Sequence, residues 1–213
     1  MGTLMEQMML ANPSYFQIRL ISASDNGLER VRVDRAEDRL VRVRGDDLQE
    51  KGHFSYVSSA LKLATGATFL SRLVINHERG AHAGLDQPSV ILATPVQDPQ
   101  GKTVGVVVIN LDLNGVFASL RADLPKDYQL FLANRNGDYV VHPDPSQAFG
   151  FDKGRRVFVQ EEFEATNALM EGRASSVVTE VQTGKYANAP VVAAFVGRVV
   201  KISSDEDRLI VGL

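Results

Sequence analysis

Hydrophobic and polar residues alternate along two separate stretches of the chain, and an Asn-Gly pair follows in each. The first stretch is YFQIRLISASDNGLERVRVD, from Tyr15, and the second is YQLFLANRNG, from Tyr128. Alternation places successive side chains on opposite faces of a strand, and Asn-Gly tolerates the positive φ angles of a tight turn. Each stretch is therefore predicted to form an antiparallel hairpin.

A segment with helical spacing follows each hairpin, over 46–66 and 159–172, although Gly52 interrupts the first of them. Two apolar runs of strand length complete each half, and they cover 88–96 and 104–111, then 190–200 and 208–213. The sequence thus predicts an α+β fold built as a tandem of two related units, each a central antiparallel sheet flanked by helices.

The first hairpin gathers charged side chains on one face. By strand parity Arg19, Arg30, Arg32 and Asp34 share that face, and a four-residue loop would place Arg19 directly opposite Arg32. A two-residue loop would instead place Arg19 opposite Asp34. Opposed like charges need a compensating anion. The face is therefore either the solvated outer surface of the sheet or the floor of a site for an anionic ligand, with Arg30 solvated near the turn.

The composition narrows the classes of function. The chain has 213 residues, 44% of them hydrophobic and 23% charged, which is an ordinary globular balance. A net charge of −3 argues against a general nucleic-acid binder, and the absence of cysteine excludes disulfides, thiolate metal sites and cysteine nucleophiles. No run is long enough to span a bilayer, and no signal peptide is evident. The chain starts like the tail of a helix and stops on an apolar strand, so both ends are interpreted as cuts within a longer chain.

The motifs of common enzymes fail in detail. QGKT at 100–103 lacks the glycine that a phosphate loop needs at Val96, and a strand follows it instead of a helix. In HERGAH, His77 and His82 are five residues apart rather than four, so a polar loop is favoured over a metal site. HPDP at 142–145 is interpreted as a rigid turn. The sequence therefore predicts no catalytic residues, no metal and no cofactor.

Five segments in order resemble a known family: YFQIRLI…NGLERVRVD, LQEKGHFSYVSSA, FLSRLVINHERG, PSVILATPVQDPQGKTVGVVVINLD and LANRNGDYVVHPD. Together they look like a double Cache domain, a PAS-like tandem that forms the extracytoplasmic part of bacterial sensor histidine kinases, diguanylate cyclases and chemoreceptors. The resemblance implies the end of an N-terminal helix at 1–12, a membrane-distal unit at 13–124 and a membrane-proximal unit at 125–213.

The resemblance also implies a function. A small molecule would bind in the distal unit, and the signal would pass through membrane spans outside this sequence to a cytoplasmic kinase or cyclase module. The receptor is expected to be a homodimer with its sensor on the periplasmic side. The amino-acid-binding subset of the family carries a tryptophan motif, and this chain has no tryptophan. The ligand class of that subset is therefore not carried over.

Six residues are candidate ligand contacts, each with a structural alternative. Tyr56 is either a ligand contact on the helix over the pocket or a core aromatic residue. Asn110, at the end of an apolar strand, could contact the ligand or a neighbouring backbone, and Arg72 could bind a carboxylate or lie on the surface. The full set comprises Arg19, Arg32, Tyr56, Ser71, Arg72 and Asn110.

The arginines and the missing tryptophan lead to the hypothesis that the ligand is a small anion such as a carboxylate. The alternative function is a periplasmic protein-interaction module that binds no small molecule. A distal core filled entirely by apolar side chains would favour that alternative.

Overall fold

The computed structural model describes residues 1–76, 87–181, 191–202 and 205–213. The chain divides into unit 1, which comprises Met1–Val116 with Ile202, and unit 2, which comprises Phe117–Lys201 and Asp205–Leu213. The division falls within α3 (Asn114–Ala122). Within the described part of the chain, no helix is both long and apolar enough to cross a bilayer. The assignment of the units as membrane-distal and membrane-proximal stays a prediction.

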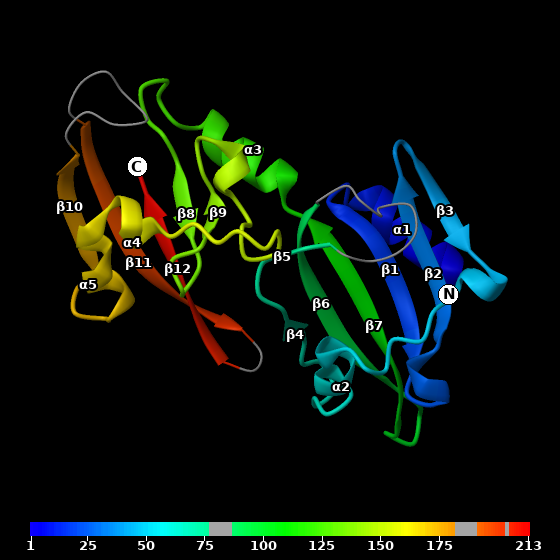
Figure 1. Cartoon of the computed structure of the whole chain (residues 1–213). Coiled ribbons are helices and arrows are strands. Elements are labelled where there is room, and N and C mark those ends of the chain that lie inside the picture. The colour runs from blue at the N-terminus through cyan, green and yellow to red at the C-terminus, as the bar shows by residue number, and fades with distance from the viewer. Residues whose placement is uncertain (77–86, 182–190, 203–204) are drawn as a thin grey trace. The chain divides into compact units, whose positions relative to one another are not determined.

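Unit 1 is built on an antiparallel sheet with the strand order β3-β2-β1-β7-β6-β4, and β5 also pairs with β6 (Figure 1). The strands are β1 (Tyr15–Ser22), β2 (Glu29–Ala36), β3 (Arg39–Val43), β4 (Phe69–Leu70), β5 (Val74–Ile75), β6 (Pro88–Gln97) and β7 (Thr103–Asp112). The helices of this unit are α1 (Gly2–Ala11) and α2 (Ser55–Ala60).

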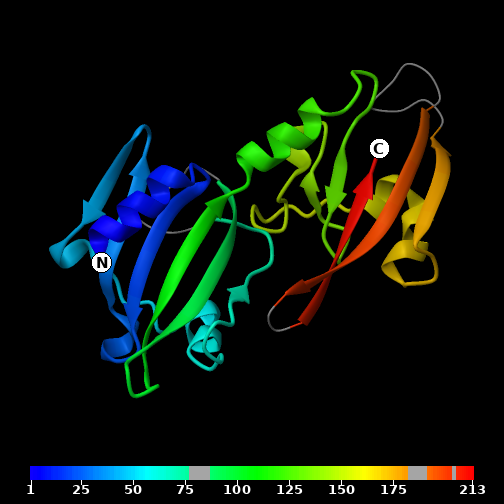
Figure 2. The same ribbon diagram turned by 180° about the vertical axis from the view of Figure 1, so that it is seen from behind.

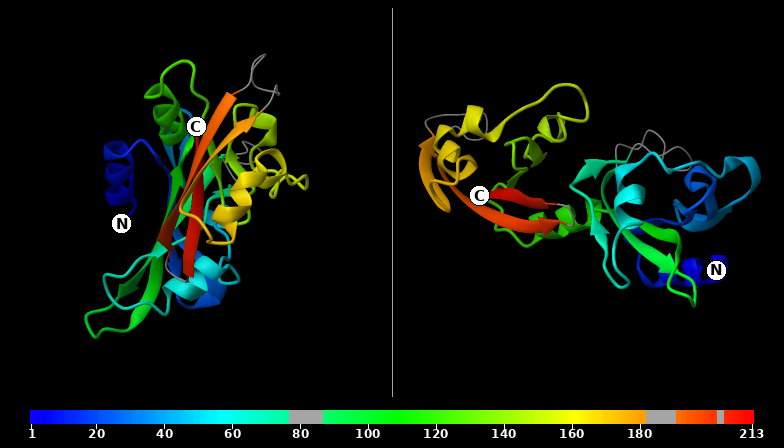
Figure 3. Two further views of the ribbon diagram at one scale, coloured as in Figure 1. Left: turned by 90° about the vertical axis from the view of Figure 1, so that its left-hand side faces the viewer. Right: turned by 90° about the horizontal axis from the view of Figure 1, so that it is seen from below.

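Helices cover both faces of this sheet, because its strands carry apolar side chains on both sides. Ile18 of β1 packs on one face against Met5 and Met9 of α1. Ile21 packs on the other face in a cluster with Val57 of α2. Figure 2 shows α1 in front of β1 and β2, and Figure 3 shows α1 and α2 on opposite sides of the sheet. The face that holds α2 is called the α2 face below.

Unit 2 is a second antiparallel sheet with the order β10-β11-β12-β8-β9. Its elements are β8 (Phe131–Ala133), β9 (Tyr139–Val141), α4 (Val159–Glu162), α5 (Asn167–Met170), β10 (Ser176–Val181), β11 (Val191–Ile202) and β12 (Asp205–Gly212). Its core joins Phe131, Tyr139 and Phe195 of the strands to Phe163, which follows α4, and Leu169 of α5.

The internal repeat predicted from the sequence is confirmed by the topology of the two sheets. In unit 1, β1 and β2 form the first hairpin, and β4, β6 and β7 follow later in the chain. These five strands lie in the order β2-β1-β7-β6-β4. The equivalent strands of unit 2 run β9-β8-β12-β11-β10, which is the same order. The predicted α+β tandem of antiparallel sheets with an N-terminal helix is therefore correct.

The predicted helix over 46–66 is wrong for most of its length, since only α2 and a 3₁₀ turn at Gly45–Asp47 form. The segment before α2 pairs instead with the first hairpin: Lys51 N donates to Gly27 O over 2.9 Å, and Gly52 N donates to Asn26 O over 2.9 Å. A side chain at Gly52 would come within 2.5 Å of that Asn26 oxygen. Glycine thus permits a close backbone approach here, and the approach replaces helical hydrogen bonds.

The predicted helix over 159–172 is likewise divided, into α4, a 3₁₀ turn at Glu164–Thr166 and α5. Phe163 interrupts it with a non-helical backbone at φ −126° and ψ 81°, and its ring joins the core of unit 2. Gly172, at φ +73°, follows the end of α5 in the left-handed conformation that commonly terminates a helix.

Candidate functional site

A one-residue bulge in β2 determines which side chains meet on the α2 face. The register pairs Gln17 with Asp34 and Arg19 with Arg32, then shifts so that Ile21 pairs with Glu29. Arg30 is the extra residue in β2. Because of this shift, Glu29 lies on the same face as Arg19 and Arg32, and the side chain of Arg30 is turned outward.

Arg30 is the arginine predicted to be solvated, and the structure confirms this. Its side chain is 51% exposed and forms an ion pair with Asp25, which is equally exposed. Arg19 and Arg32 behave differently, with 0% and 1% of their surface exposed. The interpretation of this face as a solvated outer surface is therefore wrong for both.

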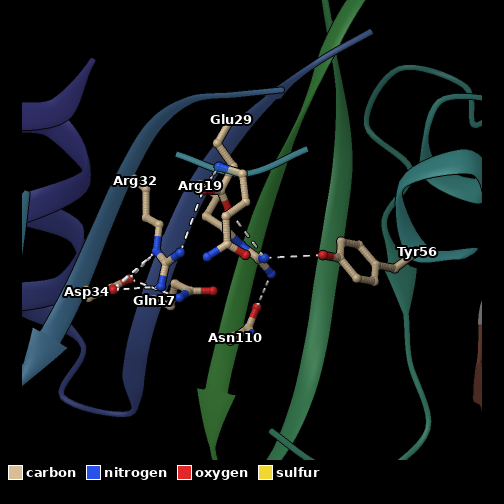
Figure 4. A network of polar contacts seen from close by, with 8 residues as sticks. Gln17, Arg19, Glu29, Arg32, Asp34, Tyr56 and Asn110 are labelled. Atoms are coloured by element: carbon tan, nitrogen blue, oxygen red, sulfur yellow. Dashed lines mark hydrogen bonds and ion pairs between the residues drawn. The ribbon is translucent and has the colours of Figure 1, made fainter. Parts of the chain in front are cut away.

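Arg19 lies at the centre of a polar network on the α2 face (Figure 4). Its Nη1 donates to Tyr56 Oη over 3.2 Å, and its Nη2 donates to Asn110 Oδ1 over 2.8 Å. Nη1 also lies 3.6 Å from Glu29 Oε1. Side chains of β2, β7 and α2 thus surround one buried guanidinium group, which β1 carries.

Arg32 is held mainly by Asp34, two residues along the same strand. Nε donates to Asp34 Oδ1 and Nη2 donates to Asp34 Oδ2, each over 2.9 Å. Gln17 Nε2 donates to the same Oδ1 over 2.9 Å. Burial acts to lower the pKa of Arg32, but the hydrogen bond and charge of Asp34 and the charge of Glu29 outweigh it. The pKa is raised, although Arg19 opposes this.

Glu29 lies between the two opposed arginines. Its Oε1 is 3.6 Å from Arg19 Nη1, and its Oε2 is 3.7 Å from Arg32 Nη1. Oε2 also accepts a hydrogen bond from Gln49 N over 3.1 Å. The compensating anion that two opposed arginines need is therefore supplied by the protein itself, as Figure 4 shows.

Several buried polar atoms beside this network have no hydrogen-bond partner. Among the described residues they include Gln17 Oε1, Asn110 Nδ2 and Ser89 Oγ, each on a residue that is at most 1% exposed. Buried polar atoms without a partner are uncommon in folded proteins, and they often mark a position for water or a ligand. The three atoms offer both a donor and acceptors on the α2 face.

Four of the six predicted contacts come together in this network: Arg19, Arg32, Tyr56 and Asn110. Ser71 lies just after β4, where its hydroxyl accepts from Ile91 N over 2.8 Å and donates to Arg72 O over 2.7 Å. The side chain of Arg72 is exposed. The role of all six in binding stays a prediction. His77 and His82, which were weighed as metal ligands, lie outside the described residues.

Sequence reasoning missed Glu29, and it assigned no role to Gln17. Parity placed Glu29 on the face opposite Arg32, and only the bulge brings them together. Gln17 shares parity with Arg19, and the register that opposes Arg19 to Arg32 also places it opposite Asp34, so its position could have been found from that alternative.

A cavity of about 590 Å³ opens beside the first hairpin turn in unit 1. The residues that line it include Ser22 and Asp25 of the hairpin, Glu50 and His53 of the following segment, and Val57 of α2. Tyr56, next to Val57, belongs to the polar network. The cavity therefore lies next to α2, at the end of the sheet that carries the turn.

Two antiparallel sheets of one strand order, preceded by an N-terminal helix, place the chain in the tandem PAS-like class of sensor domains. The family model for the sensor domain of bacterial histidine kinases matches residues 3–167. The chain belongs to this family, which confirms the sensor-domain prediction. No curated protein matches the chain.

Solved structures with the same fold cover the whole chain. A domain of a sensory box/GGDEF family protein from Vibrio parahaemolyticus has a TM-score of 0.72 and 17% identity, over 100% of this chain and 76% of its own. The extracellular domain of the histidine kinase vpHK1S-Z8 has a TM-score of 0.71 and 17% identity, over 100% and 72%. The ligand-binding domain of the Pseudomonas fluorescens chemoreceptor CtaA, in complex with L-serine, has a TM-score of 0.58 and 18% identity, over 100% of this chain and 78% of its own.

Proposed function

We propose that the chain is the extracytoplasmic sensor of a membrane-anchored bacterial receptor and binds a small polar molecule on the α2 face of unit 1. The observation that carries the proposal is the set of buried atoms without partners, Gln17 Oε1, Asn110 Nδ2 and Ser89 Oγ, beside a fully buried network. A neighbour of this fold, the CtaA domain, is solved in complex with L-serine, which supports a small ligand.

In this proposal unit 1 is the membrane-distal unit and unit 2 passes the signal toward a cytoplasmic kinase or cyclase module, within a homodimer. Unit 2 repeats the strand order, but its first hairpin has Phe131 and Leu132 at the centre of the strand and no arginine there. The ligand must bind the two signalling states with different affinity, because equal affinity would shift no population.

Native mass spectrometry of the purified domain, followed by a thermal-shift screen, tests the proposal. A bound molecule stabilises by about RT ln(1+[L]/Kd), so a hit at a hundredfold excess over Kd adds about 2.7 kcal/mol. Asn110→Leu, which removes an amide from the network, should abolish the stabilisation. Arg30→Met, on the exposed side of the same hairpin, should leave it unchanged.

The alternative of a protein-interaction module predicts a different result. No small molecule would be retained and none would stabilise unit 1, while a periplasmic protein would bind in a pull-down and Asn110→Leu would not affect it. The predicted anionic charge of the ligand is a separate question, and the contacts around Arg19 and Arg32 bear on it directly.

A further inference from the structure

We infer that Glu29 sets the charge preference of unit 1, so that the site on the α2 face accepts a small polar molecule without net charge and excludes small anions. The inference rests on the proposed ligand-binding function and specifies the chemical class of its ligand. It replaces the hypothesis, drawn from the arginines, that the ligand is an anion.

Opposite charges balance among the four ionised side chains of the network that belong to the described residues. Arg19 and Arg32 carry two positive charges, and Glu29 and Asp34 carry two negative charges. All four side chains are at most 2% exposed. A small anion at these arginines would therefore meet a neutral group of charges, while still losing its hydration on burial. Burying an ion without a compensating charge is strongly unfavourable.

A polar molecule without net charge avoids this cost and matches the atoms that lack partners. Asn110 Nδ2 is a donor and requires an acceptor from the ligand. Gln17 Oε1 is an acceptor and requires a donor. A ligand that presents one acceptor and one donor would satisfy these two atoms without adding charge.

Glu29, rather than Asp34, is the carboxylate that decides the preference. Asp34 is fixed by two 2.9 Å hydrogen bonds from Arg32 and a third from Gln17. Glu29 is 3.6 Å and 3.7 Å from the two arginines, beyond ordinary hydrogen-bond distance, so it acts on them chiefly through its charge. Its charge is also the one shared by both arginines.

Acetate and acetamide form a matched pair of probes, because they have nearly the same size and shape and differ in charge. The test measures their apparent Kd by ligand-observed NMR and by thermal shift, with wild type, Glu29→Gln and Glu29→Gln/Arg32→Gln. Glu29→Gln keeps the shape of the side chain and leaves one excess positive charge. It should bind acetate at least about tenfold more tightly than wild type, as expected for a carboxylate beside an uncompensated arginine.

The double variant restores the balance of charge between Arg19 and Asp34 and should lose this gain. Arg30→Gln is the control for a charge change on the same hairpin and should bind acetate as weakly as wild type. Wild type that binds acetate more tightly than acetamide would overturn the inference, and so would a Glu29→Gln protein that gains no acetate binding.

The two proposals fail in different ways. A gain of acetate binding in Glu29→Gln supports the role of Glu29 whether or not wild type retains a molecule on purification. If Glu29→Gln does not fold alone, the double variant should fold, because its charges balance, and acetate should raise the yield of refolded Glu29→Gln more than acetamide does. Equal yields with the two probes would overturn the inference.

Discussion

The buried pair of Arg32 and Asp34 should show strong energetic coupling. Both side chains are 2% exposed, and two 2.9 Å hydrogen bonds join them. Removing one partner of a buried ion pair leaves an uncompensated charge and costs about 3–5 kcal/mol. We therefore expect Arg32→Met and Asp34→Leu each to lower the free energy of unfolding by about that amount.

The double variant should cost far less than the sum of the two. It leaves Arg19 and Glu29 as a balanced pair, and its main defect is the loss of the acceptor for Gln17 Nε2. A buried donor that loses its acceptor costs about 1–3 kcal/mol. The sum of the single changes is about 6–10 kcal/mol, so the coupling energy should be at least about 3 kcal/mol.

Urea unfolding followed by far-UV circular dichroism measures these differences, since the chain has no tryptophan to report by fluorescence. Hydrogen exchange of peptides from β1 and β2 assigns the loss to unit 1. The exposed pair of Arg30 and Asp25 is the matched control, and Arg30→Met should cost at most about 1 kcal/mol. A double variant of Arg32 and Asp34 that loses the full sum of the single effects would refute the reasoning.

Two further changes are informative. In urea unfolding, Gly27→Ala should destabilise unit 1 by more than Gly45→Ala. Both positions have positive φ, which costs about 1–2 kcal/mol for alanine. Only at Gly27 would the new Cβ also overlap the backbone of Gly52. Equal losses would contradict that overlap. The pKa of Asp144 is lowered by hydrogen bonds from Ser146, so its carboxyl should titrate below the ordinary aspartate value in ¹³C NMR. Its contribution to stability is present above the unfolded-state pKa and is lost as the pH falls through the folded-state pKa, and Ser146→Ala should raise the titration midpoint.

The sheets of both units could be predicted because their signals are local. Alternation along β1 and the apolar runs of β6 and β7 identify strands without reference to the rest of the chain. The repeated Asn-Gly hairpin then predicts that the two halves share one arrangement, and the common strand order confirms it. The segment around Gly52 could not be predicted in this way, because its backbone bonds with Asn26 and Gly27 depend on a contact between distant residues.

The polar network shows where strand parity fails. Parity correctly placed Arg19 and Arg32 on one face. The observed register places them directly opposite each other, as the alternative with a four-residue loop predicted. The charge of that face depends on Glu29, which a single inserted residue, Arg30, brings to the same side. A bulge leaves no simple mark in the sequence, since it is stabilised by contacts that form only in the folded sheet. The two arginines by themselves therefore indicated an anion site, whereas the charges of the four described side chains cancel. Alternation in the sequence can place polar side chains on one face, but the charge balance among them follows only from the cross-strand register.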